Sequence, residues 1–165
     1  MTPTPPNTPP AAIMPQPGTA APDFRMDGDA GPISLGDFAG RKLVLYFYPK
    51  DDTPGCTVEG KAFSALKAEF DAADTAVVGV SRDSAASHAK FRAKHELTVL
   101  LGSNGGSVTE AYGVWTEKSM YGKKYMGIER ATFLIGRDGK IAELWGKVKV
   151  PGHAEAVLAS ARALA

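Results

Sequence analysis

The sequence predicts an α/β fold in which a mixed central β-sheet is flanked by helices. Apolar runs typical of strands alternate with segments whose apolar residues recur at helical spacing. A hairpin signal and an alanine-rich segment then end the chain. The 165 residues are 44% hydrophobic and 22% charged, which are the proportions of one ordinary globular domain.

The first strand is predicted over residues 43–48, a nearly continuous apolar run typical of a strand buried on both faces of a parallel sheet. The segment that follows, residues 55–70, places Phe63, Leu66 and Phe70 at helical spacing. We therefore expect one amphipathic helix there, with these three side chains turned toward the sheet.

The later elements continue the alternation. Asp83 or Ser84 is a suitable N-cap for the next helix, and Arg137-Asp138-Gly139 is a turn signal between two short strands. The predicted elements are a strand at 76–80, a helix from the cap to about 95, a strand at 97–101, a weaker helix at 107–112, a hairpin of 131–135 and 140–145, and a helix at 154–164. This order fits a thioredoxin-like arrangement.

Proline dominates the N-terminal end. Residues 1–22 hold eight of the twelve prolines and no charged side chain, so they offer little to bury and few backbone donors. The basic start and apolar run of a secretory signal are missing. We expect a flexible proline-rich tail at residues 1–20 and one thioredoxin-like domain at residues 21–165.

Charge and cysteine content exclude several classes of partner. The formal net charge is only +1, which does not indicate nucleic acid or an anionic membrane as a partner. No apolar run approaches the ~20 residues that span a bilayer. The single cysteine cannot form an internal disulfide, which fits a reducing compartment, and we expect a cytoplasmic protein.

The most informative segment joins the first strand to its helix and reads Pro49-Lys50-Asp51-Asp52-Thr53-Pro54-Gly55-Cys56-Thr57. Thr53 can be the N-cap and Pro54 the first helical residue, which puts Cys56 in the first turn. Backbone N–H groups there have no partner within the helix and can bind an anion. This position therefore favours the thiolate form of a cysteine.

A helix terminus alone is too weak to ionise a thiol. Lowering a thiol pKa from ~8.5 to ~6 requires about 3.4 kcal/mol, whereas a helix terminus supplies ~0.3–1 kcal/mol and rarely ~2. A cation or several hydrogen bonds must contribute the rest. Arg130, directly before the apolar strand at 131–135, is the best candidate for that cation.

The pattern Pro49-x-x-x-Thr53-x-x-Cys56 resembles the active-site motif of peroxiredoxins. Residues 46–57 as a whole resemble the Q-type branch, also called bacterioferritin comigratory proteins. The resemblance runs from about residue 21 to the C-terminus. It includes Ala21-Pro22-Asp23-Phe24 and the segments 79–84, 112–115, 129–135 and 147–153.

The resemblance implies a role for each matched residue. Cys56 would attack the peroxide and become a sulfenic acid, and Thr53 would hold the peroxide with its hydroxyl. Arg130 would stabilise the thiolate and the charge that develops along the O–O bond. Backbone N–H groups near Gly55 and Cys56 would add donors, while Pro49 would shield the pocket. The scheme needs no metal, haem or flavin cofactor.

The chain departs from many Q-type relatives, which carry a resolving cysteine five residues after the reactive one. Lys61 occupies that position here, and there is no second cysteine. The resemblance therefore implies a one-cysteine cycle in which an outside thiol is the reductant: thioredoxin, glutaredoxin with glutathione, or a small thiol. Q-type relatives are often monomers, so we expect a monomer.

Other functions stay open on the sequence alone. A peroxide sensor that passes oxidation to a partner through a mixed disulfide is compatible with one cysteine. A non-catalytic binding or chaperone module on the same fold is a third class. Taken singly, Cys56 could be a buried structural thiol, Thr53 only a cap, Arg130 an exposed charge and Pro49 a strand end.

Residues outside the motif give weaker signals. The histidines His88, His95 and His153 lack metal-ligand spacing, and we expect surface or core roles for them. The aromatic residues Trp115, Tyr121 and Tyr125 are expected to cover the core or line the mouth of the pocket. The glycine-rich loop at 102–106 replaces an acidic loop of relatives, and we expect it to change loop mobility without loss of chemistry.

Overall fold

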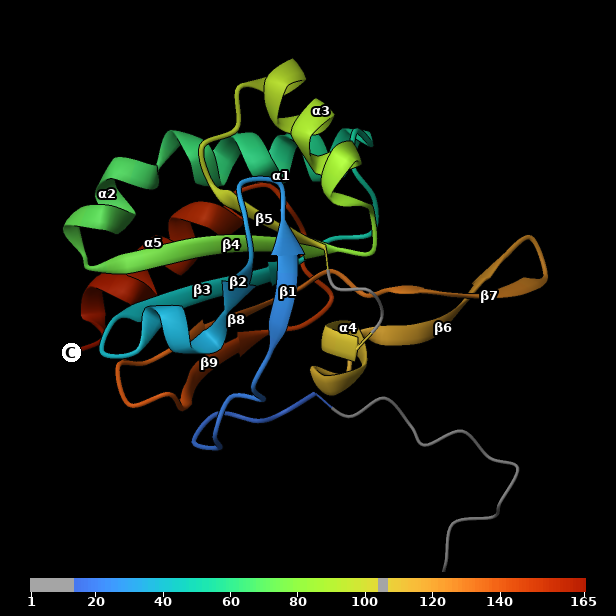
Figure 1. The fold of residues 1–165 in the computed structure, drawn as a ribbon. Coiled ribbons are helices and arrows are strands. Elements are labelled where there is room, and N and C mark those ends of the chain that lie inside the picture. The colour runs from blue at the N-terminus through green and yellow to red at the C-terminus, as the bar shows by residue number, and fades with distance from the viewer. Residues whose placement is uncertain (1–13, 104–106) are drawn as a thin grey trace, which may run out of the picture.

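The computed structural model describes residues 14–103 and 107–165 and has a mixed sheet at its centre (Figure 1). Within those residues the sheet has seven strands in the order β2-β1-β5-β4-β3-β8-β9. The strands are β1 (Arg25–Gly28), β2 (Ile33–Ser34), β3 (Lys42–Phe47), β4 (Thr75–Ser81), β5 (Leu100–Ser103), β8 (Ala131–Ile135) and β9 (Ile141–Trp145). The pairs β3–β4 and β4–β5 are parallel and the others antiparallel, which confirms the predicted mixed α/β class.

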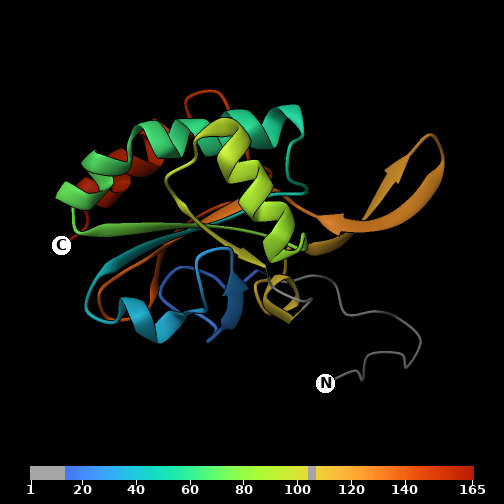
Figure 2. The same ribbon diagram turned by 45° about the horizontal axis from the view of Figure 1, so that its top comes forward.

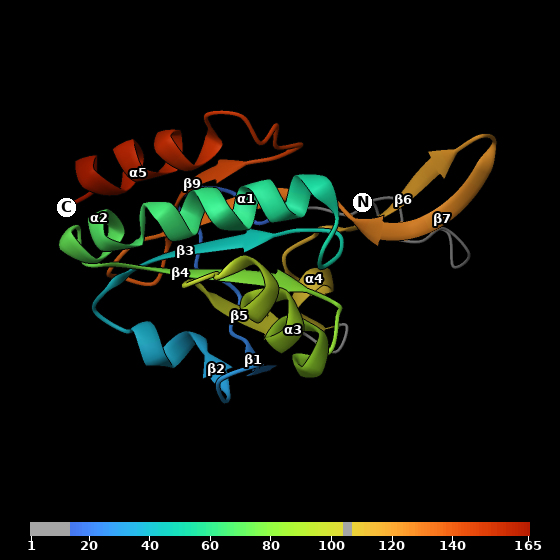
Figure 3. The ribbon, with the colours of Figure 1, turned by 90° about the horizontal axis from the view of Figure 1, so that it is seen from above.

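Helices cover both faces of this sheet, as Figures 2 and 3 show from two directions. One face carries α1 (Pro54–Ala65), α2 (Lys67–Ala72), α3 (Ala85–His95) and α5 (His153–Ala163). The opposite face carries α4 (Ser107–Ala111) and the short 3₁₀ helix η1 (Leu35–Phe38). No helix of the described residues is long and apolar enough to cross a membrane.

The continuous apolar run of β3 is explained by burial on both sides. Leu43, Leu45 and Phe47 join the core beneath α4, while Tyr46 and the residue after the strand, Tyr48, join the core beneath α1 and α3. All five are at most 1% exposed. Since side chains alternate along a strand, a run buried on both faces cannot alternate in polarity.

The predicted helix over residues 55–70 is in fact two helices. The chain bends at Leu66, whose N–H donates to the carbonyl of Phe63, three residues back, at 3.2 Å. Such a tight turn ends α1 and redirects α2, and Phe63 and Phe70 are both fully buried. The spacing of the three apolar residues was therefore a correct guide to burial but not to helix length.

The strand predicted at 97–101 begins later, at Leu100. The backbone N–H of Thr98 donates to Ser64 Oγ on α1 at 2.9 Å, and Leu97 is buried in the core cluster beneath α1. Residues 97 and 98 therefore contact α1 and do not pair with a strand. Pairing with β4 starts at Leu100, which lies opposite Val78. The glycine-rich loop at 102–106 lies partly outside the described residues.

A hairpin that the sequence analysis did not predict projects from the body of the molecule (Figures 1 and 3). It consists of β6 (Trp115–Met120) and β7 (Lys123–Ile128), joined by Tyr121 and Gly122. Both turn residues have positive φ, as a two-residue hairpin turn of type I′ requires. Tyr121 is 99% exposed, so the expectation that it covers the core or lines a pocket is wrong.

The described part of the predicted tail contacts the folded domain. The N–H of Gly18 donates to the carbonyl of Ile141 at 2.8 Å, and the N–H of Ala21 donates to Gly139 at 2.9 Å. Met14 packs against the core beneath α4. Residues 1–13 of that tail lie outside the described residues, and the boundary at residue 21 stays a prediction.

Candidate active site

The loop between β3 and α1 places Cys56 at the start of a helix. Thr53 is the N-cap residue, in extended conformation, and Pro54 is the first helical residue, as the sequence predicts. The Thr53 side chain does not cap the helix, however, because its hydroxyl donates to the carbonyl of Lys50 at 2.8 Å. The hydroxyl therefore closes the loop, and its lone pairs stay available to accept a bond.

Cys56 is the third residue of α1 and only 2% exposed. The first backbone bond of the helix runs from the N–H of Thr57 to the carbonyl of Thr53, at 2.9 Å. The N–H groups of Gly55 and Cys56 come before that bond and have no acceptor within the helix. They point out of the helix start, where they can bind an anion. The thiol thus lies where a negative charge is favoured.

Arg130 reaches the same point from another strand. It directly precedes β8, whose first residue, Ala131, lies opposite Phe47 at the end of β3. Its Nη2 donates to Cys56 Sγ at 3.2 Å. A Cβ atom on Gly55 would lie only 3.2 Å from that Nη2, so the bare backbone of Gly55 is what lets the guanidinium approach. The predicted cation and thiol are therefore in contact.

Glu59 is a third member of this cluster that the sequence analysis missed. Its Oε1 accepts from Arg130 Nη1 at 2.6 Å, while its Oε2 is buried without a partner among the described residues. Burial raises the pKa of Glu59 to about 7, although the charge and hydrogen bond of Arg130 oppose the rise. Its position three residues after Cys56, on the same helix face, was the available signal.

A cavity of ≈ 380 Å³ lies beside the loop, between it and the projecting hairpin. Burial and the charge of Arg130 lower the pKa of Lys118, which lines this cavity, whereas the negative charges of Glu129 and Cys56 oppose that shift. Trp115 and Tyr125 line it too. The lining residues are Pro49, Lys50, Arg82, Asp83, Trp115, Lys118, Tyr125, Met126, Gly127 and Ile128.

The sequence-predicted residues therefore fall into two sets. Cys56, Gly55 and Arg130 are in direct contact, together with Glu59. Thr53 caps the same helix through its backbone position, and Pro49 is exposed and lines the neighbouring cavity. Lys61, which occupies the position of a resolving cysteine in many relatives, is exposed on α1.

The three histidines lie in different environments. His153 Nε2 lies 2.8 Å from Thr132 Oγ1, and burial and the charge of Arg130 lower its pKa to about 4, so its ring is neutral at pH 7. His88 is buried on α3, and His95 pairs with Asp52. Over residues 14–103 and 107–165, no group of three or more His, Cys, Asp or Glu side chains could hold a metal ion.

Comparison with known proteins identifies the family. Residues 17–144 match the model of the AhpC/TSA family. The chain belongs to this AhpC/TSA family. The Peroxiredoxin Bcp of Xanthomonas campestris is 53% identical over 126 residues, which cover 76% of this chain and 79% of that protein. The Peroxiredoxin Bcp of Bacillus subtilis is 46% identical over 138 residues, covering 82% and 88% of the two chains.

A solved structure supports the same family assignment. The bacterioferritin comigratory protein of Xanthomonas campestris, studied for its alkyl peroxide reduction activity, is 48% identical, with a TM-score of 0.81. The match covers 85% of this chain and 90% of that one. The resemblance to Q-type peroxiredoxins and the thioredoxin-like fold are thereby confirmed. The chain is a peroxiredoxin with a single cysteine, and membership implies thiol-dependent reduction of peroxides.

Proposed function

We propose that this peroxiredoxin reduces hydrogen peroxide and organic hydroperoxides by a one-cysteine mechanism, with Cys56 as the nucleophile and an outside thiol as the reductant. The observation that carries the proposal is the 3.2 Å contact between Arg130 Nη2 and the Sγ of the chain's single cysteine, at a helix N-terminus. A charge-assisted hydrogen bond of this kind favours a thiolate where the peroxide must react.

In the first half-reaction the Cys56 thiolate attacks one peroxide oxygen and the O–O bond breaks. Sulfur is oxidised to a sulfenic acid, and the second oxygen leaves as water or an alcohol after it takes up a proton. The guanidinium of Arg130 and the amides of Gly55 and Cys56 stabilise the negative charge that moves onto the leaving oxygen. The support for organic hydroperoxides is the alkyl peroxide reduction activity for which the Xanthomonas relative is known.

Three further residues prepare this step. The Thr53 hydroxyl donates to Lys50 and can accept a hydrogen bond from the peroxide, which orients the reacting oxygen toward sulfur. Glu59 holds the second arm of the Arg130 guanidinium at 2.6 Å and so fixes its direction. Pro49 lines the cavity next to the loop and limits access of water from that side.

In the second half-reaction a thiol attacks the sulfenic sulfur, water leaves, and a mixed disulfide forms. A second thiol then releases Cys56 and takes the disulfide away. Since the chain holds no other cysteine, both thiols come from outside. Thioredoxin, glutaredoxin with glutathione, and a small thiol are the candidate reductants.

The proposal is tested by peroxide consumption by the purified protein with dithiothreitol, thioredoxin, or glutaredoxin plus glutathione. We expect turnover with at least one of them, a sulfenic acid on Cys56 by mass spectrometry when reductant is omitted, and complete loss in Cys56→Ser. Undiminished turnover in Cys56→Ser, or turnover with none of the reductants, would overturn it.

A further inference from the structure

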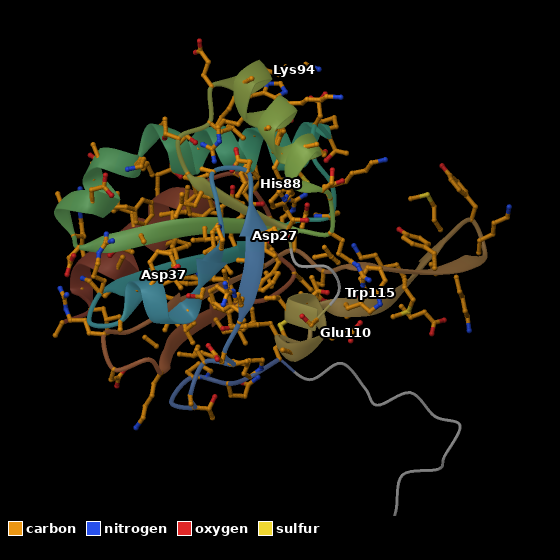
Figure 4. All side chains as sticks on the ribbon, viewed as in Figure 1. Asp27, Asp37, His88, Lys94, Glu110 and Trp115 are labelled. Carbon is orange, nitrogen blue, oxygen red and sulfur yellow. The ribbon has the colours of Figure 1, made fainter. Side chains whose placement is uncertain are left out.

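Behind the active-site loop lies a buried pair of charged side chains that the proposed chemistry does not use. His88 Nδ1 is 2.8 Å from Asp51 Oδ2, and His88 Nε2 is 3.0 Å from the carbonyl oxygen of Gly102. The side chains of His88 and Asp51 are 0% and 4% exposed. The pair is therefore closed off from solvent on the side of α3 that faces the sheet, whereas Lys94 lies on the outer side (Figure 4).

The hydrogen-bond pattern fixes the protonation of this pair. A carbonyl oxygen can only accept, so the Nε2 of His88 must donate to Gly102. Asp51 accepts from the hydroxyl of Tyr48 at 2.6 Å and from that of Ser87 at 2.8 Å, which is the environment of an ionised carboxylate. Nδ1 then donates as well, and His88 is an imidazolium.

The charges around the ring agree with this assignment. Burial lowers the pKa of His88, but the hydrogen bond and charge of Asp51, the Gly102 carbonyl and the charge of Asp83 outweigh it, so the pKa is raised above its ordinary value. Asp51 faces the ring from the loop and Asp83 from the start of α3, while Tyr48 faces it from the end of β3 at 3.3 Å.

The pair ties the loop that carries Cys56 to the rest of the fold. Asp51 belongs to that loop, His88 to α3 and Gly102 to β5, so one ring joins three separate parts of the chain. The backbone N–H of Asp51 also donates to Asp83 Oδ2, at 2.9 Å. The next residue, Asp52, has a positive φ of 58° and pairs with α3 on the outside, so the loop holds a conformation that few non-glycine residues adopt.

This tether matters because the two proposed half-reactions need different access to sulfur. Cys56 is only 2% exposed. An attacking thiol carries its own substituents and so needs more room around the sulfur than a small peroxide does. Reduction from outside therefore requires the first turn of α1 and its preceding loop to move. A tether that keeps this loop in place favours oxidation by peroxide and opposes reduction.

We propose that His88 is a positioning residue: as an imidazolium between Asp51 and Gly102, it holds the Cys56 loop in the conformation that reacts with peroxide, and loss of its proton releases the loop to the reducing thiol. This inference rests on the proposed function of Cys56. A histidine whose folded pKa is raised contributes fully below ~6.5, and its contribution is lost as pH rises through the higher folded value. The tether therefore weakens at a pH above that at which an exposed histidine loses its proton.

The test measures the two half-reactions separately in the full chain. His88→Asn keeps a donor toward Asp51 but no positive charge. We expect reduction of the sulfenic acid by dithiothreitol to quicken about tenfold and oxidation by hydrogen peroxide to slow by a smaller factor, because a shift of one order in the loop equilibrium multiplies the minor open population but lowers the dominant closed population much less. The control is Lys90→Gln, which removes an exposed positive charge from the same helix; both rates should stay unchanged.

The pH profile separates positioning from general damage. In the native chain the reduction rate, normalised to the thiolate concentration of dithiothreitol, should rise as pH passes the folded pKa of His88, and this rise should be absent in His88→Asn. Parallel slowing of both half-reactions, or no change in either, would overturn the inference. Failure of Cys56 to form any sulfenic acid would instead overturn the proposed function.

A measurement on the native chain keeps the test valid if the variant does not fold. The ¹⁵N chemical shifts of the His88 ring, followed over a pH titration, distinguish an imidazolium, with both nitrogens protonated, from a neutral ring. We expect the imidazolium pattern, with loss of one ring proton at a pH above that of an exposed histidine. Loss of the ring proton at or below the pH at which an exposed histidine titrates contradicts the proposal directly.

Discussion

The guanidinium of Arg130 lies 3.2 Å from the sulfur of Cys56, although 74 positions separate the two residues along the chain. The same guanidinium binds Glu59 at 2.6 Å, so one cation serves two groups that can both be negative. The electrostatics of the site depend on how strongly this positive charge stabilises a negative charge on the sulfur compared with one on the carboxylate.

Replacing Arg130 tests the division of its charge. Lysine keeps the charge but cannot donate to Cys56 and Glu59 at once in fork geometry, whereas glutamine keeps a donor without charge. We expect the rate constant for oxidation by peroxide to fall about 10-fold in Arg130→Lys and about 100-fold in Arg130→Gln, measured by stopped-flow fluorescence. The control, Arg137→Gln, alters an arginine at the other end of β8 that pairs with Asp74. An equal loss in that control would contradict the assignment.

Gly55 tests how closely the guanidinium must approach. Alanine there would put a Cβ atom 3.2 Å from Arg130 Nη2, so the guanidinium must shift by a few tenths of an ångström. We expect Gly55→Ala to slow peroxide oxidation about tenfold while the thermal midpoint changes little. Gly36→Ala, where no atom lies within 4 Å of the added Cβ, is the matched control. Full activity in Gly55→Ala would show that the contact is dispensable.

Thr53 tests the role of a single hydroxyl. Thr53→Val keeps the shape of the side chain but removes the bond to Lys50 and any bond to a peroxide. We expect an increase in KM for peroxide and a fall in kcat/KM of about 100-fold, whereas Thr53→Ser should retain most of the activity. A valine variant as active as the serine variant would limit Thr53 to its backbone position at the helix start.

Glu59 makes stability depend on pH with a defined sign. Its folded pKa of about 7 exceeds the unfolded value of ~4.3, so its contribution is full below ~4.3 and is lost as pH rises through about 7. Glu59→Gln lacks this loss. We therefore expect the variant to gain about 3 kcal/mol relative to the native chain between pH 4 and pH 8, measured by urea unfolding.

Glu69→Gln is the control for that measurement, because Glu69 is a half-exposed carboxylate that pairs with Arg162. A pH-dependent gain of the same size in this control would show that the effect does not come from the burial of Glu59. If the Glu59→Gln difference is constant with pH, the carboxylate is ionised equally in both states and its burial does not raise its pKa.

The sequence identified the site residues whose positions follow from the neighbouring residues in the chain. Cys56 and Thr53 follow from the cap and the first turn of one helix, and Arg130 from its place before a buried strand. Glu59 and His88 could not be found in this way, because their roles come from burial beside partners on other elements. A carboxylate on a helix is exposed in most proteins, so the spacing of Glu59 from Cys56 places it on the same helix face but does not show that it is buried there.

The elements of the fold show the same limit. Residues 43–48 were recognisable because burial on both faces leaves a continuous apolar run. The hairpin at 115–128 was missed because its strands are largely exposed and polar, with no core-facing alternation to detect. β1 and β2 are too short to give a periodic signal. The flexible tail, the cytoplasmic location and the monomeric state stay predictions.

The pairing of β3 with β8 has a consequence for synthesis of the chain. Phe47 lies opposite Ala131, so the two halves of the site meet only after β8 has joined the sheet. On a ribosome, Cys56 emerges long before Arg130 does, and domains form their long-range strand pairs late. Until then the thiol has no guanidinium beside it. The contact that joins the two halves of the site is thus among the last to form as the chain is made.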